Sequence, residues 1–357
     1  MVVQNRVNIL TTYNVLTNLA LAAGIIAACL VWKTPEAMVL AKVGISVLIG
    51  AIGIHLMLQA LPRDDWRPRW RNMKSMVAYS IPLVLATALG TIALQLDKLI
   101  VSAMCRPEEF AVYSNGAMEI PLIGIMTGSI AAVIQPDLRR LAAAGDVAGA
   151  LALFRQSAEK SAVVLIPVMM FLLVSAEPFV LTLFSARYAG SVLPFRLYLL
   201  ILPARIVLFG AFMMALGLNR MILYRTVVGL VANLILSIVL VRWLGYIGAI
   251  VGTILTIYGL ACAWNLAAIS RSVGCRWRDI IPFAGLIKLA GVSALAGLFP
   301  AVSQRFYSGA PPVIQLLLNA FVYVPALAVL AWVLRIEWLT GEGIRWWNRL
   351  IAFWRKA

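Results

Sequence analysis

The chain has 357 residues, of which 63% are hydrophobic and only 12% are charged. A soluble domain carries about 25% charged and about 45–50% apolar residues, so this composition excludes a water-soluble fold. The net charge of +16 is not evidence for nucleic-acid binding, because it lies between apolar blocks. In multi-span membrane proteins, basic residues gather in the cytoplasmic segments between the spans. We therefore expect a membrane protein with no nucleic-acid partner.

The apolar residues form ten blocks, each close to the roughly 20 residues that cross a bilayer as a helix. In chain order, the predicted spans cover residues 10–32, 36–60, 76–103, 109–135, 160–184, 192–217, 222–241, 246–270, 279–302 and 312–335. The sequence thus predicts an all-α, polytopic integral membrane protein with about ten transmembrane helices.

The orientation follows from the lysines and arginines between the spans. Nineteen of them fall on the side of the N-terminus and five on the opposite side. Because basic residues favour the cytoplasmic face, both ends of the chain are predicted to lie in the cytoplasm. Three polar segments join or follow the spans on that face: residues 61–75, residues 137–160 with a short amphipathic helix at 147–154, and the tail at 336–357. Their tryptophans and basic residues suit a membrane surface with anionic lipids.

Charged residues inside the spans are the main functional signal. A charge at the bilayer centre costs about 2.5–3.5 kcal/mol on insertion scales, and such residues usually face a cavity or a partner. The sequence therefore predicts a polar, water-accessible interior, which is typical of a transporter. The candidate residues of a substrate path are Asp97, Lys98, Glu119, Arg196, Arg205 and Lys288.

Two of these sites have competing interpretations. Asp97 and Lys98 lie about 100° apart on a helix, so they cannot pair as residues four apart do. Asp97 either lines a transport cavity or caps locally while Lys98 extends to the membrane surface. Arg205 follows Pro203, which permits a kink and frees a carbonyl. An arginine there suits a phosphate because it can bind bidentately, whereas Arg196 lies near a helix end and can equally reach the surface.

Motifs of catalysis and metal binding are missing from the sequence. It contains no Walker A motif, no HExxH and no carboxylate cluster with metal-ligand spacing. The four cysteines are scattered and there is one histidine, which argues against a zinc site or a disulfide framework. We therefore predict no catalytic residues, no metal and no cofactor, and a protein that is not an enzyme. The pair of Gly248 and Gly252 predicts close packing of two helices.

Several stretches resemble a known family in their order and spacing. One carries Asp97 and Lys98 before the Ile-x-Ser sequence at 100–102, and the next opens with Glu109 and continues to Tyr113 and Ser114. Further matching stretches lie at 79–83, 135–140, 144–146, 215–220 and 244–250. Together they are similar to polysaccharide flippases of the multidrug/oligosaccharidyl-lipid/polysaccharide exporter superfamily. Ala111 departs from the glycine usual there.

The resemblance implies a domain organisation. Family members have two six-helix lobes, some with two further helices. Residues 1–60 then correspond to the last two helices of the first lobe, so its first four helices are expected to be missing from this chain. The remaining parts are a basic cytoplasmic linker at 61–75, a complete second lobe at 76–270, two extra helices at 271–335 and a basic cytoplasmic tail at 336–357.

The resemblance also implies a function: flipping of undecaprenyl-phosphate-linked oligosaccharide across the bacterial inner membrane by alternating access, for surface polysaccharides such as the O-antigen of lipopolysaccharide. Arg205, Arg196 and Lys288 would face the pyrophosphate, and Asp97 or Glu119 would couple to an ion. Membrane lipids and glycan-assembly proteins are the further expected partners. The alternatives are a cation-coupled multidrug exporter of the same superfamily, a membrane-embedded glycan polymerase or acyltransferase, and a subunit that does not transport.

Overall fold

The computed structural model describes residues 7–32, 34–60 and 70–334, and every regular element in them is a helix. The chain divides into two units, Met1–Lys74 and Ser75–Ala357. The predicted tail at 336–357 and most of the predicted linker at 61–75 lie outside the described residues. The prediction of an all-α polytopic membrane protein is confirmed.

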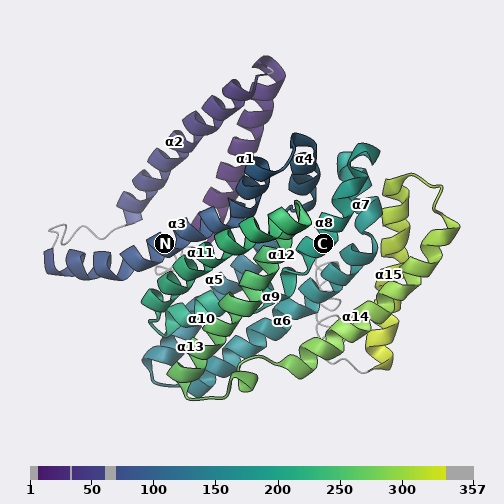
Figure 1. Cartoon of the computed structure of the whole chain (residues 1–357). Helices are drawn as coiled ribbons and strands as arrows, with labels where there is room; N and C mark the ends of the chain where they lie inside the picture. Colours follow the sequence, from purple (N-terminus) through teal and green to yellow (C-terminus); the bar gives the residue numbers. More distant parts are fainter. Residues whose placement is uncertain (1–6, 33, 61–69, 335–357) are drawn as a thin grey trace, which may run out of the picture. The chain divides into compact units, whose positions relative to one another are not determined.

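The first unit contains a hairpin of two antiparallel helices, α1 (Val7–Trp32) and α2 (Pro35–Ala60), drawn in purple in Figure 1. The Tyr13 hydroxyl donates a 2.7 Å hydrogen bond to the carbonyl of Ile49 on the partner helix. Gly24 lets the Ile45 side chain approach the α1 backbone closely. Most described side chains of this hairpin are exposed, as expected for helices whose apolar surface is covered by lipid rather than by protein.

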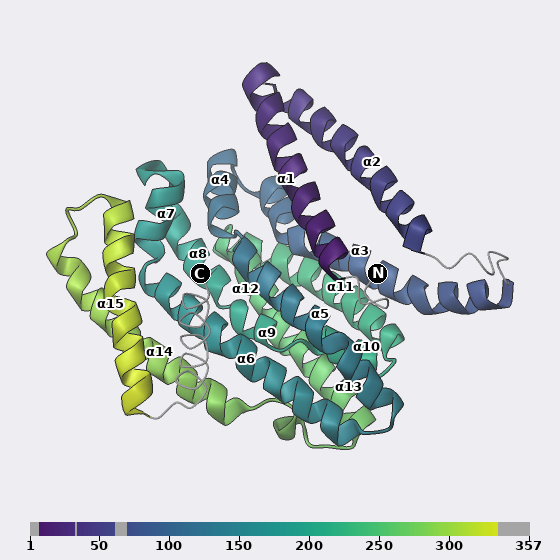
Figure 2. The same cartoon turned by 180° about the vertical axis from the view of Figure 1, so that it is seen from behind.

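The second unit begins within α3 (Trp70–Met104) and contains the remaining helices (Figures 1 and 2). In chain order these are α4 (Pro107–Gly116), α5 (Pro121–Ala143), α6 (Val147–Val174), α7 (Ala176–Phe184), η1 (Ala186–Ser191), α8 (Val192–Leu199), α9 (Leu202–Ile206), α10 (Phe209–Ala215), α11 (Asn219–Leu244), α12 (Ile247–Leu255), the π-helix η2 (Thr256–Cys262), α13 (Ala263–Val273), η3 (Trp277–Asp279), α14 (Phe283–Ser303), η4 (Gln304–Phe306) and α15 (Pro312–Val333).

Within the described ranges, seven helices are long and apolar enough to cross a membrane. An eighth is added if the pair Ala186–Leu199 and Leu202–Ala215, bent by 44°, counts as one broken span. A shorter apolar helix occupies Leu16–Val31. The predicted spans differ from these helices mainly where the chain breaks inside an apolar block.

The predicted continuous span at 109–135 is wrong, because the helix is interrupted between Gly116 and Pro121. Pro121 lacks an N–H and disfavours helical geometry in the residue before it. Ile120 accordingly has an extended backbone, with φ −79° and ψ 112°. The proline then begins α5, the first-turn position where it is tolerated best.

The predicted surface helix at 147–154 is also wrong, because these residues form the first part of the 28-residue helix α6. Asp146 caps this helix by accepting a 2.8 Å hydrogen bond from the Gly149 amide. Phe154 is fully buried and stacks on Phe212 of α10. Its burial shows that this face of α6 packs on protein, not on the membrane surface. The predicted span at 160–184 is not one helix either, since α6 ends at Val174 and α7 begins at Ala176.

Close packing of α11 and α12 follows the prediction from Gly248 and Gly252. A Cβ atom on Gly252 would lie 2.8 Å from the Ser237 hydroxyl, and one on Gly248 would collide with the Leu240 backbone. The two helices therefore approach each other in a way that larger residues would prevent. On the other side of the unit, α14 packs against α6, and α15 packs against α14 and α7.

Candidate functional site

Broken helices surround the candidate site. The apolar block at 192–217 is divided into α8, α9 and α10 by non-helical residues at 200–201 and 207–208. Pro203 lies at the start of α9, where its missing N–H costs least. Val207 then leaves the helical region, with φ −92° and ψ 110°. Breaks at membrane depth free backbone groups, so they are tolerated where protein or a cavity can satisfy those groups.

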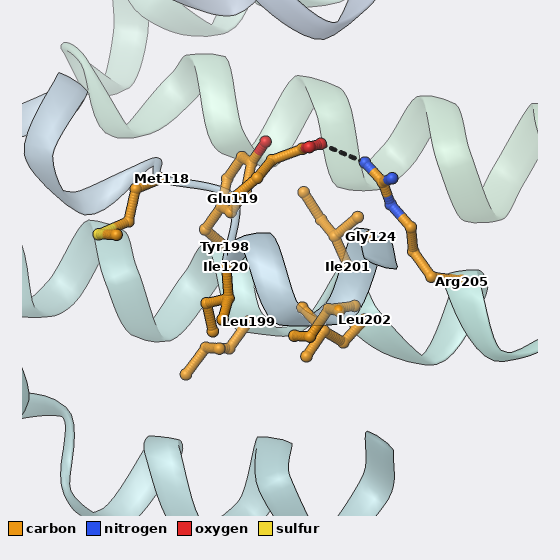
Figure 3. A pocket seen from close by; sticks show the side chains of 10 residues that line it. Met118, Glu119, Ile120, Gly124, Tyr198, Leu199, Ile201, Leu202 and Arg205 are labelled. Carbon is orange, nitrogen blue, oxygen red and sulfur yellow. Dashed lines mark hydrogen bonds and ion pairs between the residues drawn. The ribbon is translucent and has the colours of Figure 1, made fainter. Parts of the chain in front are cut away.

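An ion pair joins two of these breaks (Figure 3). The Arg205 guanidinium, on α9, donates to the Glu119 carboxylate, which lies in the interruption between α4 and α5. The two residues are 86 positions apart in the chain. Both side chains remain partly accessible, at 35% for Arg205 and 45% for Glu119. The pair thus borders open space instead of being sealed in the core.

A small cavity of about 30 Å³ lies beside this pair, and its size suits one or two water molecules. Tyr198 lines it together with Glu119 and Arg205, and Figure 3 shows the tyrosine next to the carboxylate. The rest of the lining is mainly apolar and comes from both interrupted spans. Its remaining residues are Met118, Ile120, Ile123, Gly124, Leu199, Ile201 and Leu202.

Asp97 is the most deeply placed acid of the site, with only 3% of its surface exposed. Its carboxylate accepts a 2.7 Å hydrogen bond from the Tyr113 hydroxyl of α4 and a 2.8 Å bond from the Lys98 amide. Tyr113 is itself fully buried. A buried carboxylate needs such donors, because leaving it without them is costly. The arrangement fixes the orientation of Asp97 relative to α4.

Asp97 also borders a second cavity, of about 210 Å³, inside the same unit. Arg205 lines both cavities, as do Tyr198 and Ile201. The wall of the larger cavity comes from α3, α8, α9, α11, α12 and the π-helix η2. Its polar lining residues are Asp97, Tyr198, Arg205, Arg225, Thr226, Asn233, Thr253 and Thr256.

The wall formed by α11 and α12 carries a short hydrogen-bond network. Ser237 donates a 2.9 Å bond to the side-chain carbonyl of Asn233, and Thr253 of α12 contacts the same oxygen at 3.4 Å. Asn233 and Ser237 are both buried. Polar groups in a membrane interior gain when they are paired across helices, so this network holds the amide of Asn233 at the cavity wall.

The π-helix η2 connects the cavity wall to the broken span. The Tyr258 hydroxyl, within η2, donates a 2.6 Å hydrogen bond to the carbonyl of Leu200 at the break between α8 and α9. That bond pairs a carbonyl at the helix interruption. Single π turns inside α-helices occur frequently at functional sites. The π-helix η2 and the break between α8 and α9 are thus in contact directly before α9, the helix that carries Arg205.

The structure brings together three of the six residues predicted for the substrate path. Asp97 and Arg205 line the larger cavity, and Glu119 and Arg205 line the smaller one. Lys98 is half-buried and follows Asp97 on α3. Arg196 on α8 and Lys288 on α14 are exposed and line neither of these two cavities.

Sequence reasoning missed the α11 side of the site. Arg225 lies near the start of a span and was therefore assigned to the cytoplasmic face. The available signal is the spacing of Thr226, Asn233 and Ser237, seven and four residues apart, which places them on one face of a helix. In an otherwise apolar helix, such a polar face indicates a buried polar environment.

The chemistry available here is the binding of a small ion or a charged headgroup. Among the residues that the structure describes, no group of three or more His, Cys, Asp or Glu is placed to hold a metal ion. The larger cavity is smaller than the roughly 300–1,000 Å³ clefts that take drug-sized ligands. It therefore suits one charged group and not an oligosaccharide.

The fold and site define a multi-pass helical membrane protein with broken spans around a charged cavity, and the same fold is found in a known flippase. The solved structure "Lipid II flippase MurJ, inward closed conformation" is similar over 89% of this chain and 67% of that one, with a TM-score of 0.59 and 14% sequence identity. At that identity the likeness concerns the fold.

The family is shown by sequence. The pattern of the family described as "Polysaccharide biosynthesis protein" matches residues 4–193, more than half of the chain, and the chain belongs to this family. This confirms the family resemblance found in the sequence. Among curated proteins, no sequence matches the chain.

Proposed function

We propose that this protein moves a lipid-linked oligosaccharide across the bacterial inner membrane by alternating access, and that the lipid carrier is undecaprenyl phosphate. The product supplies surface polysaccharide assembly, with glycan-assembly proteins as partners on either side of the transport step. The molecule is moved without chemical change, so the protein acts as a transporter and not as an enzyme. The observation that carries this proposal is the Glu119–Arg205 pair between two broken spans.

Arg205 suits the phosphate of such a carrier. A guanidinium has five N–H donors in a planar fork that matches phosphate geometry. The described contact to Glu119 involves one terminal nitrogen, which leaves other donors for a substrate. In the absence of substrate, Glu119 compensates the charge of Arg205; when an anionic headgroup arrives, the guanidinium exchanges one partner for the other. Secondary transporters typically form their substrate sites at discontinuous helices, and Arg205 lies on such a helix.

Asp97 suits the coupling step. It is buried, borders the same cavity as Arg205 and is held by Tyr113. A buried carboxylate changes its interactions strongly when a proton or a metal ion binds. Because the sequence has no ATP-binding motif, an ion gradient is the driving force that this chain can use by itself. Asp97 is the group that we assign to it.

The multidrug exporter is the second candidate function, and Asp97 is the observation that favours it, since a buried acid suits a cationic drug. Two observations favour the flippase instead. The cavity contains two arginines besides Asp97, which disfavour a cation, and the family is one of polysaccharide biosynthesis. Drug susceptibility of cells with and without the protein separates the two candidates.

The test is the variant Arg205→Ala in cells that depend on this protein for surface glycan. We expect export to fall at least about tenfold, equivalent to about 1.4 kcal/mol of lost interaction, with an unchanged amount of protein in the membrane. Arg205→Lys keeps the charge but loses the bidentate geometry and is expected to be intermediate. Arg242→Ala, an exposed arginine in the last turn of α11, is the matched control. Normal glycan export by Arg205→Ala would refute the proposal.

A further inference from the structure

Arg225 lies on α11 and lines the 210 Å³ cavity together with Arg205 and Asp97. Its terminal nitrogen donates a 3.1 Å hydrogen bond to the Thr226 hydroxyl oxygen. Its Nε atom is buried and has no hydrogen-bond partner. Between residues 70 and 334, no acid lies within ion-pair distance of this guanidinium. The side chain therefore presents an uncompensated positive charge at the cavity wall.

The other two charged residues of this cavity are compensated. Arg205 pairs with Glu119, and Asp97 accepts hydrogen bonds from Tyr113 and the Lys98 amide. Burying an unpaired charge is unfavourable, and proteins retain such charges mainly where a ligand or partner completes them. The imbalance at Arg225 therefore indicates that an anion belongs beside it.

Arg225 and Asp97 occupy opposite ends of the cavity. Asp97 and Tyr113 lie beside a cluster that contains Val241 and Ala249, at the end of α11 and the start of α12. Arg225 lies in the second turn of α11, whereas Val241 lies in its last turns. Asn233, which also lines the cavity, is eight residues after Arg225, or about 12 Å along the helix at 1.5 Å per residue. The cavity thus has an acidic end and a basic end, so an anion at Arg225 does not have to approach Asp97.

Thr226 orients the basic end. Its hydroxyl donates a 2.8 Å bond to the carbonyl of Ile222, and the same oxygen accepts from Arg225. Because the hydroxyl is committed to the helix backbone, the guanidinium has one fixed neighbour and several free N–H groups. A fixed, planar set of donors is the arrangement that binds a phosphate group bidentately.

We propose that Arg225 binds a phosphate group in this cavity, as a second phosphate-binding residue in addition to Arg205. The inference rests on the proposed function, because that function supplies a lipid carrier with such a group. A volume of about 210 Å³ accepts the phosphate and leaves the sugars outside. A lipid phosphate and a free phosphate have the same chemistry at this site, so the experiment includes both.

The test measures binding by the full-length protein in lipid nanodiscs, with undecaprenyl phosphate and inorganic pyrophosphate as separate probes. We expect Arg225→Gln to weaken binding of undecaprenyl phosphate at least tenfold, and Arg225→Lys to give an intermediate loss. Arg220→Gln, an exposed arginine in the first turn of the same helix, is the control and should change binding less than twofold. Tighter binding of pyrophosphate than of undecaprenyl phosphate would identify free phosphate as the ligand.

The outcomes test the inference at Arg225 separately from the proposed function. Equal binding of both probes by wild type and Arg225→Gln overturns the inference at Arg225, as does a wild-type protein that binds neither probe. The proposed function stands or fails independently, through glycan export by Arg205→Ala. Thermal unfolding of every variant is measured in the same nanodiscs. If Arg225→Gln unfolds at a lower temperature than wild type, the binding of Arg225→Lys, which keeps the charge, is compared instead. Weaker binding by Arg225→Lys then supports the inference, and wild-type binding overturns it.

Discussion

The wall of the cavity and the pair of helices α14 and α15 use polar residues in opposite ways. Both regions consist of apolar helices with prolines and polar side chains at membrane depth. In α15, Asn319 is fully buried and bonds to Ser175 of the α6–α7 junction at 3.0 Å and to the Tyr307 hydroxyl at 2.6 Å. The Tyr323 hydroxyl donates to the carbonyl of Pro167 on α6. These bonds connect helices that would otherwise meet only through apolar contacts.

The cavity wall has similar residue types but a different environment. Asp97, Arg205 and Arg225 face an open volume, and Arg225 has no acidic partner among the residues that the structure describes. The difference teaches that a polar residue in a span is not by itself a sign of transport. Polar groups that pair with other helices stabilise the packing, whereas charged groups that border a cavity can exchange partners.

The largest effect is expected for Asp97→Asn. The amide oxygen can accept from the Lys98 amide, and the amide NH2 can donate to the Tyr113 hydroxyl, so the packing of α3 on α4 is kept, but the negative charge is lost. We expect glycan export to fall to the level of cells without the protein. The unfolding temperature should be unchanged or higher, because a neutral amide costs less to bury than an ionised carboxylate. Export near the wild-type level would contradict the prediction and show that Asp97 stabilises the packing without acting in transport.

A large effect on stability, without one on transport, is expected for Asn319→Leu. The substitution removes the bonds to Ser175 and Tyr307. The Tyr307 hydroxyl keeps its contact with Ser303, but the buried Ser175 hydroxyl loses the donor that Asn319 supplies. The cost of leaving buried polar groups unpaired is about 1–3 kcal/mol. Denaturant unfolding in detergent micelles measures the loss, and glycan export is normalised to the amount of folded protein. A fall in normalised export would contradict this assignment, because it would show that α15 takes part in transport.

A smaller effect is expected for Tyr323→Phe. The ring stays in place beside Phe171, and only the hydroxyl is lost. A typical intramolecular hydrogen bond contributes about 0.5–1.5 kcal/mol, so the unfolding free energy should fall by about 1 kcal/mol. Tyr258→Phe is the informative counterpart, because its hydroxyl bonds to the break at Leu200. We expect the first variant to export normally and the second to export less at equal amounts of folded protein.

The smallest effect is expected for Lys288→Gln. This lysine lies in the second turn of α14, is exposed and lines neither of the two cavities at the candidate site. A long side chain on a lipid-facing helix reaches the polar interface. We expect export within twofold of wild type. A strong loss would show that charges outside the cavities also guide the substrate, as the sequence interpretation suggested.

Hydropathy predicted the class of fold because the length of an apolar block is a property of the sequence itself. Prolines marked the interruptions near Pro121 and Pro203, but an apolar block does not reveal that a helix stops and restarts within it. The 147–154 segment was misassigned because its polar residues precede a span; tertiary packing of Phe154 on Phe212 extends the helix through it.

For the candidate site, sequence reasoning identified individual charges but could not identify which of them are neighbours. Glu119 and Arg205 lie on different spans, and their contact depends on how α4, α5 and α9 pack. Arg225 was counted among the nineteen basic residues on the cytoplasmic side, because it lies near the start of the predicted span at 222–241. Only the packing of α11 against the π-helix shows that this arginine turns into a cavity.

The π-helix η2 has a further consequence for the span that contains it. A π turn accommodates more residues than an α turn, and one residue corresponds to about 100° of helix rotation. Gly248 and Gly252 hold α12 against α11, so rewinding η2 into regular α-helix would turn α13 about the helix axis while α12 stays in place. Such a rotation would take place beside Arg225 and the break at Leu200, which η2 contacts. Access to the basic end of the cavity can then change without separating α12 from α11.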